Sequence, residues 1–221
     1  MSALEPVLIV GAGGHGRGIL EILRAVAVVA GTACPVAGFL DDDPSVLAAM
    51  PGGLPVLGSL DEAPGLIRSG HRFLIGVGEP RIRRAVADRL AMNGAVFATA
   101  VHPSVIMYGD VSVAPGCALG AGVVVAAATR LCDQVLLNLN ATVGHDCLLE
   151  RFATVGPGAN IGGNVRMGEG AFVGLNGTVL PGRGLGPASQ LGAGSVLLDD
   201  LEAGCIAFGV PARVVGRTEQ R

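Results

Sequence analysis

The most regular hydrophobic pattern in the chain is a repeat of six residues that begins near residue 105. The residue directly after each repeated aliphatic position is very often glycine, and the fourth residue after it is usually small. The repeated positions all carry Leu, Ile, Val or Met, namely Met107, Val113, Leu119, Val125, Leu131, Leu137, Val143, Leu149, Val155, Ile161, Met167, Val173, Val179, Leu185, Leu191 and Leu197.

A period of six fits neither an α-helix nor an isolated strand, but it fits a short flat strand followed by a corner. We therefore expect residues 104–221 to form a parallel β-helix with a C-terminal tail. One large and one small side chain should point inward per repeat, and coils should stack at the usual strand spacing of ~4.8 Å. The frame runs without a slip from 107 to 202, which predicts that no long loop interrupts the stack.

The first part of the chain has a different pattern, in which short apolar runs alternate with amphipathic helical segments. Strands are predicted at 7–10, 36–40, 73–77 and 95–101, and helices after residue 16 and over 81–93. Strands that alternate with helices indicate a parallel sheet. The sequence thus predicts a Rossmann-like α/β domain over residues 1–103.

Composition supports a stacked architecture and removes several functional classes. Half of the residues are apolar but only 3% are aromatic, and 36 of the 221 residues are glycine. The net charge of −3 argues against nucleic-acid binding. The chain contains no lysine, which excludes a P-loop lysine or a Schiff base, and its five cysteines form no C-x-x-C pair. No stretch is typical of a signal peptide or a membrane span, so we expect a cytoplasmic protein.

Two features carry candidate chemistry. His145 is the one histidine after His102, and the six-residue frame directs it away from the core. Histidine is a natural general base near neutral pH, although a lone histidine often has no catalytic role. If one coil spans three repeats, Gly163 stacks beside His145 and presents a backbone N–H near the base. Asp146 is either a partner for the imidazole or a solvated turn carboxylate.

The segment Gly11–Gly16 satisfies the G-x-G-x-x-G pattern directly after a predicted strand. This pattern fits a tight turn, a dinucleotide site or another phosphate site, because a helix N-terminus favours anions. Asp41 and Asp42, which follow the second predicted strand, lie farther away than the ~20 residues typical of the acidic residue of a dinucleotide site. That spacing disfavours NAD.

With the six-residue repeats, the segments GAGGHG, FLDDD, IGVGEPRIR, HPSV, TVGHD and GVPAR resemble one family of hexapeptide-repeat acyltransferases over nearly the whole chain. This family comprises the nucleotide-sugar N-acetyltransferases and sialic-acid O-acetyltransferases of the NeuD/PglD type. The resemblance implies a left-handed parallel β-helix after a nucleotide-sugar-binding α/β domain. It also implies a homotrimer that binds acetyl-CoA between neighbouring β-helices, with no metal.

The resemblance also implies roles for individual residues. His145 and Asp146 correspond to the catalytic base and its acidic partner. The remaining matches are backbone contacts to acetyl-CoA at Gly163, Leu175 and Ala193, diphosphate contacts at Gly13, Gly14 and His15, base and ribose contacts at Asp41 and Asp42, and an acceptor-sugar contact at Asn138.

We expect acetyl transfer to the amine of a nucleotide-linked 4-amino-4,6-dideoxy sugar for surface glycan synthesis, because the first domain has the motifs needed to hold a nucleotide. One alternative is O-acetylation of sialic acid or another sugar hydroxyl, and another is a non-catalytic nucleotide-sugar-binding protein. A zinc-dependent carbonic anhydrase also uses this type of β-helix, but it needs more histidines than this one provides. The sequence does not identify the nucleotide, the sugar or the length of the acyl group.

Overall fold

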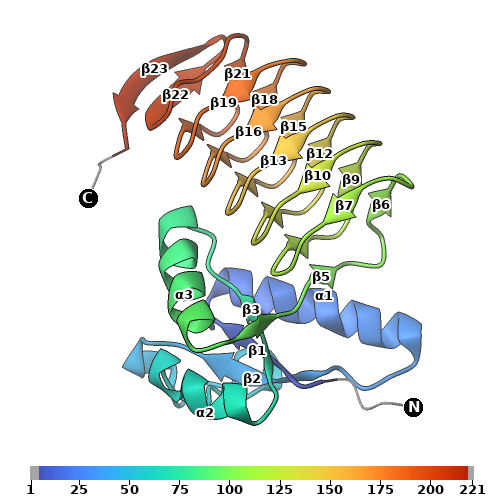
Figure 1. Ribbon diagram of the computed structural model, residues 1–221, viewed down its shortest axis with the longest axis vertical. Helices are drawn as coiled ribbons and strands as arrows, with labels where there is room; N and C mark the ends of the chain where they lie inside the picture. Colours follow the sequence, from blue (N-terminus) through green and yellow to red (C-terminus); the bar gives the residue numbers. More distant parts are fainter. Residues whose placement is uncertain (1–4, 219–221) are drawn as a thin grey trace. The chain divides into compact units, whose positions relative to one another are not determined.

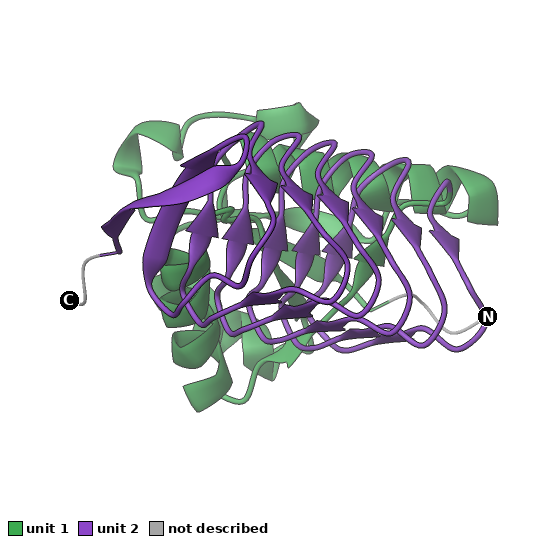
Figure 2. Ribbon diagram, turned by 90° about the horizontal axis from the view of Figure 1, so that it is seen from above, with its two compact units in different colours: residues 1–103 green, residues 104–221 purple. Residues whose placement is uncertain are grey.

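The computed structural model describes residues 5–218, which divide into two compact units at Pro103 and Ser104 (Figure 2). Unit 1 is the α/β part of the chain and unit 2 is the repetitive part (Figure 1). Among residues 5–218, no helix combines the length and hydropathy needed to cross a bilayer.

Unit 1 contains a four-stranded parallel sheet with the strand order β2-β1-β3-β4. The strands of this sheet are β1 (Val7–Val10), β2 (Val36–Leu40), β3 (Arg72–Ile75) and β4 (Val96–Phe97). The helices are α1 (Gly14–Ala30), α2 (Ala63–Arg68) and α3 (Pro80–Met92), with 3₁₀ turns at Pro44–Val46, Pro51–Gly53 and Leu60–Glu62. The alternation of strands and helices confirms the α/β class predicted from the sequence.

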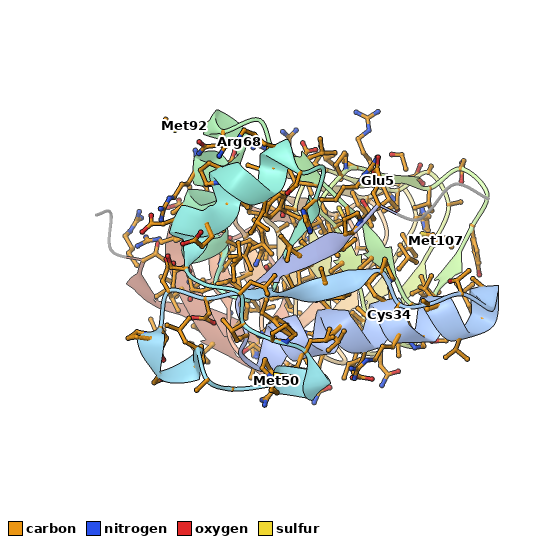
Figure 3. All side chains as sticks on the ribbon, turned by 90° about the horizontal axis from the view of Figure 1, so that it is seen from below. Glu5, Cys34, Met50, Arg68, Met92 and Met107 are labelled. Atoms are coloured by element: carbon orange, nitrogen blue, oxygen red, sulfur yellow. The ribbon has the colours of Figure 1, made fainter. Side chains whose placement is uncertain are left out.

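Two details of unit 1 differ from the sequence prediction. The strand predicted over 95–101 is two short strands, β4 and β5 (Ala100–Val101), because β4 pairs with β3 only at Val96 and Phe97. The short helix α2 was not predicted, since Pro64 and Gly65 interrupt its helical pattern. The apolar side chains of β1 and β3 are buried, whereas Met50 and Met92 project from unit 1 into solvent (Figure 3).

Unit 2 is a parallel β-helix built from two-residue strands that follow the six-residue frame. Thr142 pairs with Asn160, and Asn160 pairs with Thr178, so each coil contains eighteen residues, the difference between 142 and 160. The strands are β6 (Ile106–Met107), β7 (Ser112–Val113), β8 (Ala118–Leu119), β9 (Val124–Val125), β10 (Arg130–Leu131), β11 (Leu136–Leu137), β12 (Thr142–Val143), β13 (Leu148–Leu149), β14 (Thr154–Val155), β15 (Asn160–Ile161), β16 (Arg166–Met167), β17 (Phe172–Val173), β18 (Thr178–Val179), β19 (Gly184–Leu185), β20 (Gln190–Leu191) and β21 (Val196–Leu197).

These strands form three flat sheets along the stack, visible in Figure 1 as successive triangular coils. One sheet contains β7, β10, β13, β16 and β19, and a second contains β6, β9, β12, β15, β18 and β21. The third sheet contains β8, β11, β14, β17 and β20. Each coil therefore has three corners, and equivalent corners of successive coils line up as three edges of the helix.

The interior of the β-helix confirms the predicted inward positions. The repeated aliphatic residues from Leu119 to Leu197 are buried, as are the small residues at the second inward position, such as Ala141, Ala153 and Ala159. Met107, in the first coil of the stack, is 40% exposed. The core of unit 2 is thus a column of stacked aliphatic side chains.

The glycine directly after the inward aliphatic residue is explained by the close approach of the next coil rather than by the turn conformation. A Cβ atom on Gly144 would lie 2.5 Å from the amide nitrogen of Gly163, so the next coil leaves no room for it. The residue that needs left-handed backbone comes two positions later, as at Asn140, Asp146 and Asn164, whose φ angles lie between 56° and 58°. Asn and Asp adopt this conformation more readily than most residues.

The frame does slip before residue 202, contrary to the sequence prediction. Leu185 pairs with Leu201, and Gln190 pairs with Ile206, so the last coil is two residues shorter than the others. The chain then forms an antiparallel hairpin from β22 (Cys205–Gly209) and β23 (Ala212–Arg217). The Ser195 hydroxyl accepts a hydrogen bond of 2.9 Å from the Gly209 amide, which ties this hairpin to the preceding coil.

Candidate active site

His145 and Asp146 form the corner between β12 and β13. Asp146 has left-handed backbone with φ of 56°, which turns its carboxylate toward the preceding side chain. Its Oδ2 lies 2.7 Å from Nδ1 of His145, so the proton of the neutral ring belongs on Nδ1 and Nε2 is left unprotonated. Both side chains are more than half exposed. A solvated pair of this kind adds little stability, but it fixes the orientation of the ring.

Gly163 lies directly beside the imidazole in the next coil. A Cβ atom on Gly163 would lie 2.6 Å from Nε2 of His145, so the ring occupies the space that a side chain would fill. The carbonyl of Gly163 accepts a hydrogen bond from Gly182, and the amide of Asn164 donates to the carbonyl of His145. Within residues 5–218, the Gly163 amide donates to no other group of the chain. The structure therefore brings His145, Asp146 and Gly163 together.

The other predicted contacts in unit 2 lie on a different edge of the helix. Leu175 and Ala193 follow β17 and β20 at equivalent corners of successive coils, and Gly194 donates to the Leu175 carbonyl. Asn138 follows β11 on the same edge, and its Oδ1 accepts a hydrogen bond from the Leu139 amide. Leu139 and Leu175 are both more than half exposed, so this edge presents an apolar surface. One copy of the chain does not bring these residues to His145.

In unit 1, the glycines of the Gly11–Gly16 segment serve two different purposes. Gly11, Gly16 and Gly76 pack against one another: a Cβ atom on Gly16 would lie 1.8 Å from the Gly11 carbonyl oxygen, and one on Gly76 would lie 2.4 Å from Cα of Gly16. By contrast, a Cβ atom on Gly13 or Gly14 would meet no atom of residues 5–218 within 4 Å. Close packing within the chain therefore explains Gly11, Gly16 and Gly76, whereas the described residues leave open space at Gly13 and Gly14.

That open space lies at the amino terminus of α1. Gly13 is the N-cap residue, no side chain caps the helix, and its first turn contains no acidic residue. The first amides of a helix lack intrahelical partners and carry a partial positive charge. An anion such as a phosphate fits this position, since no Cβ of Gly13 or Gly14 keeps it from the backbone.

His15 lies over the turn between β3 and α3. A Cβ atom on Gly78 would lie 2.5 Å from Cε1 of His15, so Gly78 provides the surface on which the ring rests. Arg83 donates hydrogen bonds of 2.9 Å to the carbonyls of Val77 and Gly78 in the same turn. Partial burial lowers the pKa of His15 below its ordinary value, and the positive charge of Arg83 lowers it further. His15 is therefore neutral at pH 7 and able to donate one hydrogen bond.

Both predicted base and ribose contacts already hold backbone groups. Oδ2 of Asp41 accepts a hydrogen bond of 2.7 Å from the Ala12 amide, and its Oδ1 accepts one from Asp43. Oδ1 of Asp42 accepts a hydrogen bond of 2.7 Å from the Leu60 amide. Sequence reasoning missed this use of the carboxylates. The adjacency of β1 and β2 in a parallel sheet was the available signal, because it brings the end of β2 beside residue 12.

The buried cysteines of unit 2 and Asp43 of unit 1 have structural surroundings. Cys117 and Cys147 lie in the core of the β-helix, and burial raises the pKa of the Cys117 thiol to about 12. Across residues 5–218, no group of three His, Cys, Asp or Glu side chains has a metal-binding arrangement. Asp43 caps the following 3₁₀ turn by accepting a hydrogen bond from Ser45, which lowers the pKa of its carboxyl.

Comparison with known protein families identifies residues 6–90 as a PglD N-terminal domain. A GDP-perosamine N-acetyltransferase of Escherichia coli O157:H7 is 27% identical over 151 residues, which are 66% of this chain and 68% of that protein. The serine acetyltransferase of Escherichia coli K12 is 28% identical over 112 residues, which are 50% of this chain and 40% of that enzyme.

Solved structures match both units together. A variant of perosamine N-acetyltransferase from Caulobacter crescentus, in complex with CoA and GDP-perosamine, is 33% identical. It has a TM-score of 0.89, with 97% of this chain and 98% of that chain covered. The acetyltransferase domain of PglB from Neisseria gonorrhoeae, in complex with acetyl coenzyme A, is 29% identical with a TM-score of 0.87. That match covers 96% of this chain and all of the other.

These matches confirm the α/β domain followed by a left-handed β-helix, and they confirm the family that the sequence motifs resemble. The chain belongs to the NeuD/PglD-type sugar acetyltransferases and is an acetyl-CoA-dependent acyltransferase.

Proposed function

We propose that this enzyme transfers the acetyl group of acetyl-CoA to the amino group of a nucleotide-linked 4-amino-4,6-dideoxy sugar for surface glycan synthesis. The observation that carries the proposal is the coexistence of two features in one chain. One is an imidazole that Asp146 orients and that stands over Gly163. The other is an uncapped helix amino terminus with open space at Gly13 and Gly14, which is suited to an anion. The Caulobacter relative, whose complex contains CoA and GDP-perosamine, supports the same pairing of ligands.

The chemistry follows from the geometry at His145. The acceptor amine attacks the thioester carbonyl while Nε2 of His145 takes the proton that the nitrogen loses. Asp146 holds Nδ1 and stabilises the ring as it becomes positively charged. The Gly163 amide faces the carbonyl oxygen as negative charge develops there. The C–S bond then breaks, the CoA thiol leaves with a proton, and an amide remains on the sugar.

In unit 1, the first turn of α1 and its glycines Gly13 and Gly14 contact the diphosphate of the acceptor, with His15 as a neutral hydrogen-bond donor. The Asp41 carboxylate holds the Ala12 amide and so shapes the diphosphate loop, and its remaining lone pairs face the nucleoside. The second aspartate, Asp42, holds the Leu60 segment beside it. This arrangement assigns acceptor recognition to unit 1 and acetyl transfer to unit 2.

The homotrimer is part of the proposal because one copy lacks a complete acetyl-CoA site. His145 and Gly163 lie on one edge of the β-helix, whereas Leu175, Ala193 and Asn138 lie on another. An acetyl-CoA molecule between two copies would contact the His145 edge of one copy and the Leu175 edge of its neighbour. Three copies around an axis satisfy all three sites, and sedimentation equilibrium measures this mass directly. We place the enzyme in the cytoplasm, where acetyl-CoA and nucleotide sugars are made.

The test of the proposal is release of free CoA thiol from acetyl-CoA against a panel of acceptors. The panel contains UDP- and GDP-linked 4-amino sugars, free sialic acid and CMP-linked sialic acid. Turnover with a nucleotide-linked amino sugar supports the proposal. Turnover with sialic acid alone would mean that the acceptor group is a hydroxyl, and it would contradict the proposal. Failure of every member of the panel to react would contradict the proposal as well.

A further inference from the structure

Thr129 places a hydroxyl group inside the β-helix, at a position that is otherwise mostly apolar. It occupies the second inward position of its repeat, which is valine at 123, 135 and 165 and alanine at 141 and 153. Only 1% of Thr129 is exposed. A buried hydroxyl lowers stability unless it is hydrogen-bonded, so its partners indicate why this position is polar.

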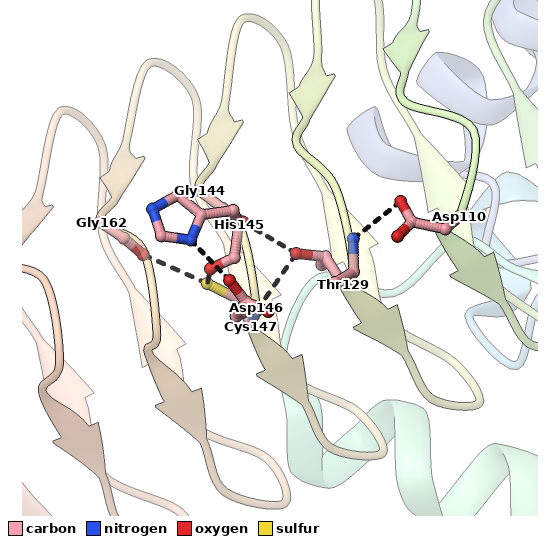
Figure 4. A network of polar contacts seen from close by, with 8 residues as sticks. Asp110, Thr129, Gly144, His145, Asp146, Cys147 and Gly162 are labelled. Atoms are coloured by element: carbon pink, nitrogen blue, oxygen red, sulfur yellow. Dashed lines mark hydrogen bonds and ion pairs between the residues drawn. The ribbon is translucent and has the colours of Figure 1, made fainter.

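Both partners of the hydroxyl belong to the corner that contains His145 and Asp146. Oγ1 of Thr129 donates a hydrogen bond of 2.8 Å to the Gly144 carbonyl, and it accepts one of 3.2 Å from the Cys147 amide. These two groups stand directly before and directly after the His145–Asp146 pair (Figure 4). The side chain of Thr129 therefore bridges the two ends of the turn from the preceding coil.

Several corners on the other two edges of the β-helix close without such a bridge. At corners such as 138–141, 156–159 and 168–171, the amide of the fourth residue donates directly to the carbonyl of the first, over distances of 2.9 to 3.1 Å. On the edge that carries 144–147, the described corners 126–129 and 162–165 have no direct bond between the fourth amide and the first carbonyl. At 144–147, the equivalent carbonyl and amide are both bonded to Thr129. The hydroxyl therefore links the two groups at a corner that has no direct bond between them.

The groups on either side of Thr129 are fixed as well. Oδ1 of Asp110 accepts a hydrogen bond of 2.9 Å from the Ala128 amide, next to Thr129 in the chain. The Cys147 thiol lies 3.2 Å from the Gly162 carbonyl, next to Gly163. Figure 4 shows these contacts as one network that runs from Asp110 through Thr129 to the coil that contains Gly162.

We propose that Thr129 is a positioning residue for acetyl transfer: its hydroxyl sets the width of the 144–147 corner and thereby the placement of the His145 imidazole over Gly163. This proposal rests on the proposed function for its kinetic consequence, but the hydroxyl bridge itself is independent of the substrate. Thr129 touches neither the imidazole nor any reacting atom, so it acts only through the backbone of the corner.

The test uses Thr129→Val, which keeps the volume and removes the bridge, and Thr129→Ser, which keeps the hydroxyl. Valine at 123, 135 and 165 indicates that the β-helix accepts it at this position. We expect Thr129→Val to lower kcat ~10- to 100-fold, as displacement of a catalytic group does. The KM of the acceptor and the affinity for acetyl-CoA should stay within about threefold of wild type, and Thr129→Ser should restore kcat to within about threefold.

The matched control is Ser189→Ala. Ser189 is fully buried at the same inward position of a later repeat, and its hydroxyl has no hydrogen-bond partner within residues 5–218. We expect this variant to keep the wild-type kcat. Equal losses of kcat in Thr129→Val and Thr129→Ser would overturn the proposal, because packing rather than the hydroxyl would then set the rate.

A second readout, amide hydrogen exchange, is independent of any acceptor. In Thr129→Val the Cys147 amide should exchange at least ~10-fold faster than in wild type, since its acceptor is lost. The Ala141 amide, which closes its own corner directly, should be unchanged. If no acceptor is turned over, the proposed function fails. The exchange rate of the Cys147 amide then still tests whether the Thr129 hydroxyl bridges the corner. An unchanged Cys147 exchange rate would overturn the positioning role.

Discussion

Asp41 and Asp42 of unit 1 differ from Asp146 of unit 2 in what their carboxylates hold. In unit 1, Asp41 and Asp42 accept hydrogen bonds from backbone amides, so they fix the paths of two loops. In unit 2, Asp146 holds the ring nitrogen of His145, a titratable group on the surface. A carboxylate bound to backbone supports a site, whereas a carboxylate bound to an exposed imidazole changes which ring nitrogen is available for proton transfer. This difference supports the proposal that unit 1 binds the acceptor and that unit 2 carries out acetyl transfer.

The glycines of the two units can be grouped by what fills the space where a side chain would be. Gly144 and Gly16 are glycine because backbone from a neighbouring segment lies where their side chains would be. No atom of the described residues occupies the corresponding space at Gly13 and Gly14. Gly163 differs from both groups, since the space beside it is filled by the imidazole of His145. The open space at Gly13 and Gly14 supports the proposed phosphate contact because it lies at the amino terminus of α1, which no side chain caps.

The largest effect should come from His145→Ala, which removes the proposed base from unit 2. We expect kcat to fall by roughly 10²- to 10⁴-fold, the usual contribution of a general base. Binding of acetyl-CoA and of the acceptor, measured by calorimetry, should remain close to wild type. The control His71→Ala changes a histidine of unit 1 outside the proposed sites. A wild-type kcat in His145→Ala would contradict the role of His145 as the general base.

A smaller loss should follow from Gly163→Ala, because the new methyl group would displace the imidazole. We expect kcat to fall ~10- to 100-fold. Thermal unfolding should change little, since the displaced ring is more than half exposed and can turn outward into solvent. Gly109→Ala is the control, because a Cβ atom there would meet nothing within 4 Å. Equal activity in the two variants would show that the position of the ring over Gly163 has no catalytic consequence.

Asp41→Ala should affect unit 1 alone. It leaves the Ala12 amide without its acceptor and loosens the loop that is proposed to hold the diphosphate, so the KM of the acceptor should rise about tenfold. The affinity for acetyl-CoA should not change. Asp43→Ala removes a neighbouring carboxylate that caps only the following turn, and it serves as the control. An unaltered acceptor KM in Asp41→Ala would contradict this role.

The smallest effect concerns the pH dependence of acceptor binding. Burial, and then the charge of Arg83, lower the pKa of His15 in the free enzyme below 6.5. A bound diphosphate favours the protonated ring and raises that pKa, so binding takes up protons. Acceptor affinity should therefore increase a few-fold as the pH falls from above 6.5 toward the pKa of the free enzyme. His15→Gln should abolish this slope, and an identical slope in the variant would exclude His15 as its source.

Much of the fold was predictable from the sequence because its determinants are local. The inward aliphatic residues from Leu119 to Leu197 and the strands of unit 1 follow directly from periodicity. The two-residue shortening after Leu197 was not predictable, since it depends on the pairing of Gln190 with Ile206 in the last coil.

The candidate site was predictable only in part. The stacking of Gly163 beside His145 follows from an eighteen-residue coil, and the structure has that arrangement. The bond from Ala12 to Asp41 and the bridge made by Thr129 depend on side-chain contacts between distant segments, which no local pattern contains. The roles assigned to Leu175, Ala193 and Asn138 stay predictions, because one copy of the chain separates them from His145.

The most direct test of the account follows the acetyl group itself. The wild-type enzyme is incubated with acetyl-CoA carrying a ¹³C label in its acetyl group and with a nucleotide-linked 4-amino sugar, and the labelled product is examined by NMR before and after hydroxylamine treatment. The account predicts one acetyl group per sugar in an amide on the amino nitrogen, which resists hydroxylamine. A label in an ester that hydroxylamine cleaves, or a label that never leaves CoA, would contradict it.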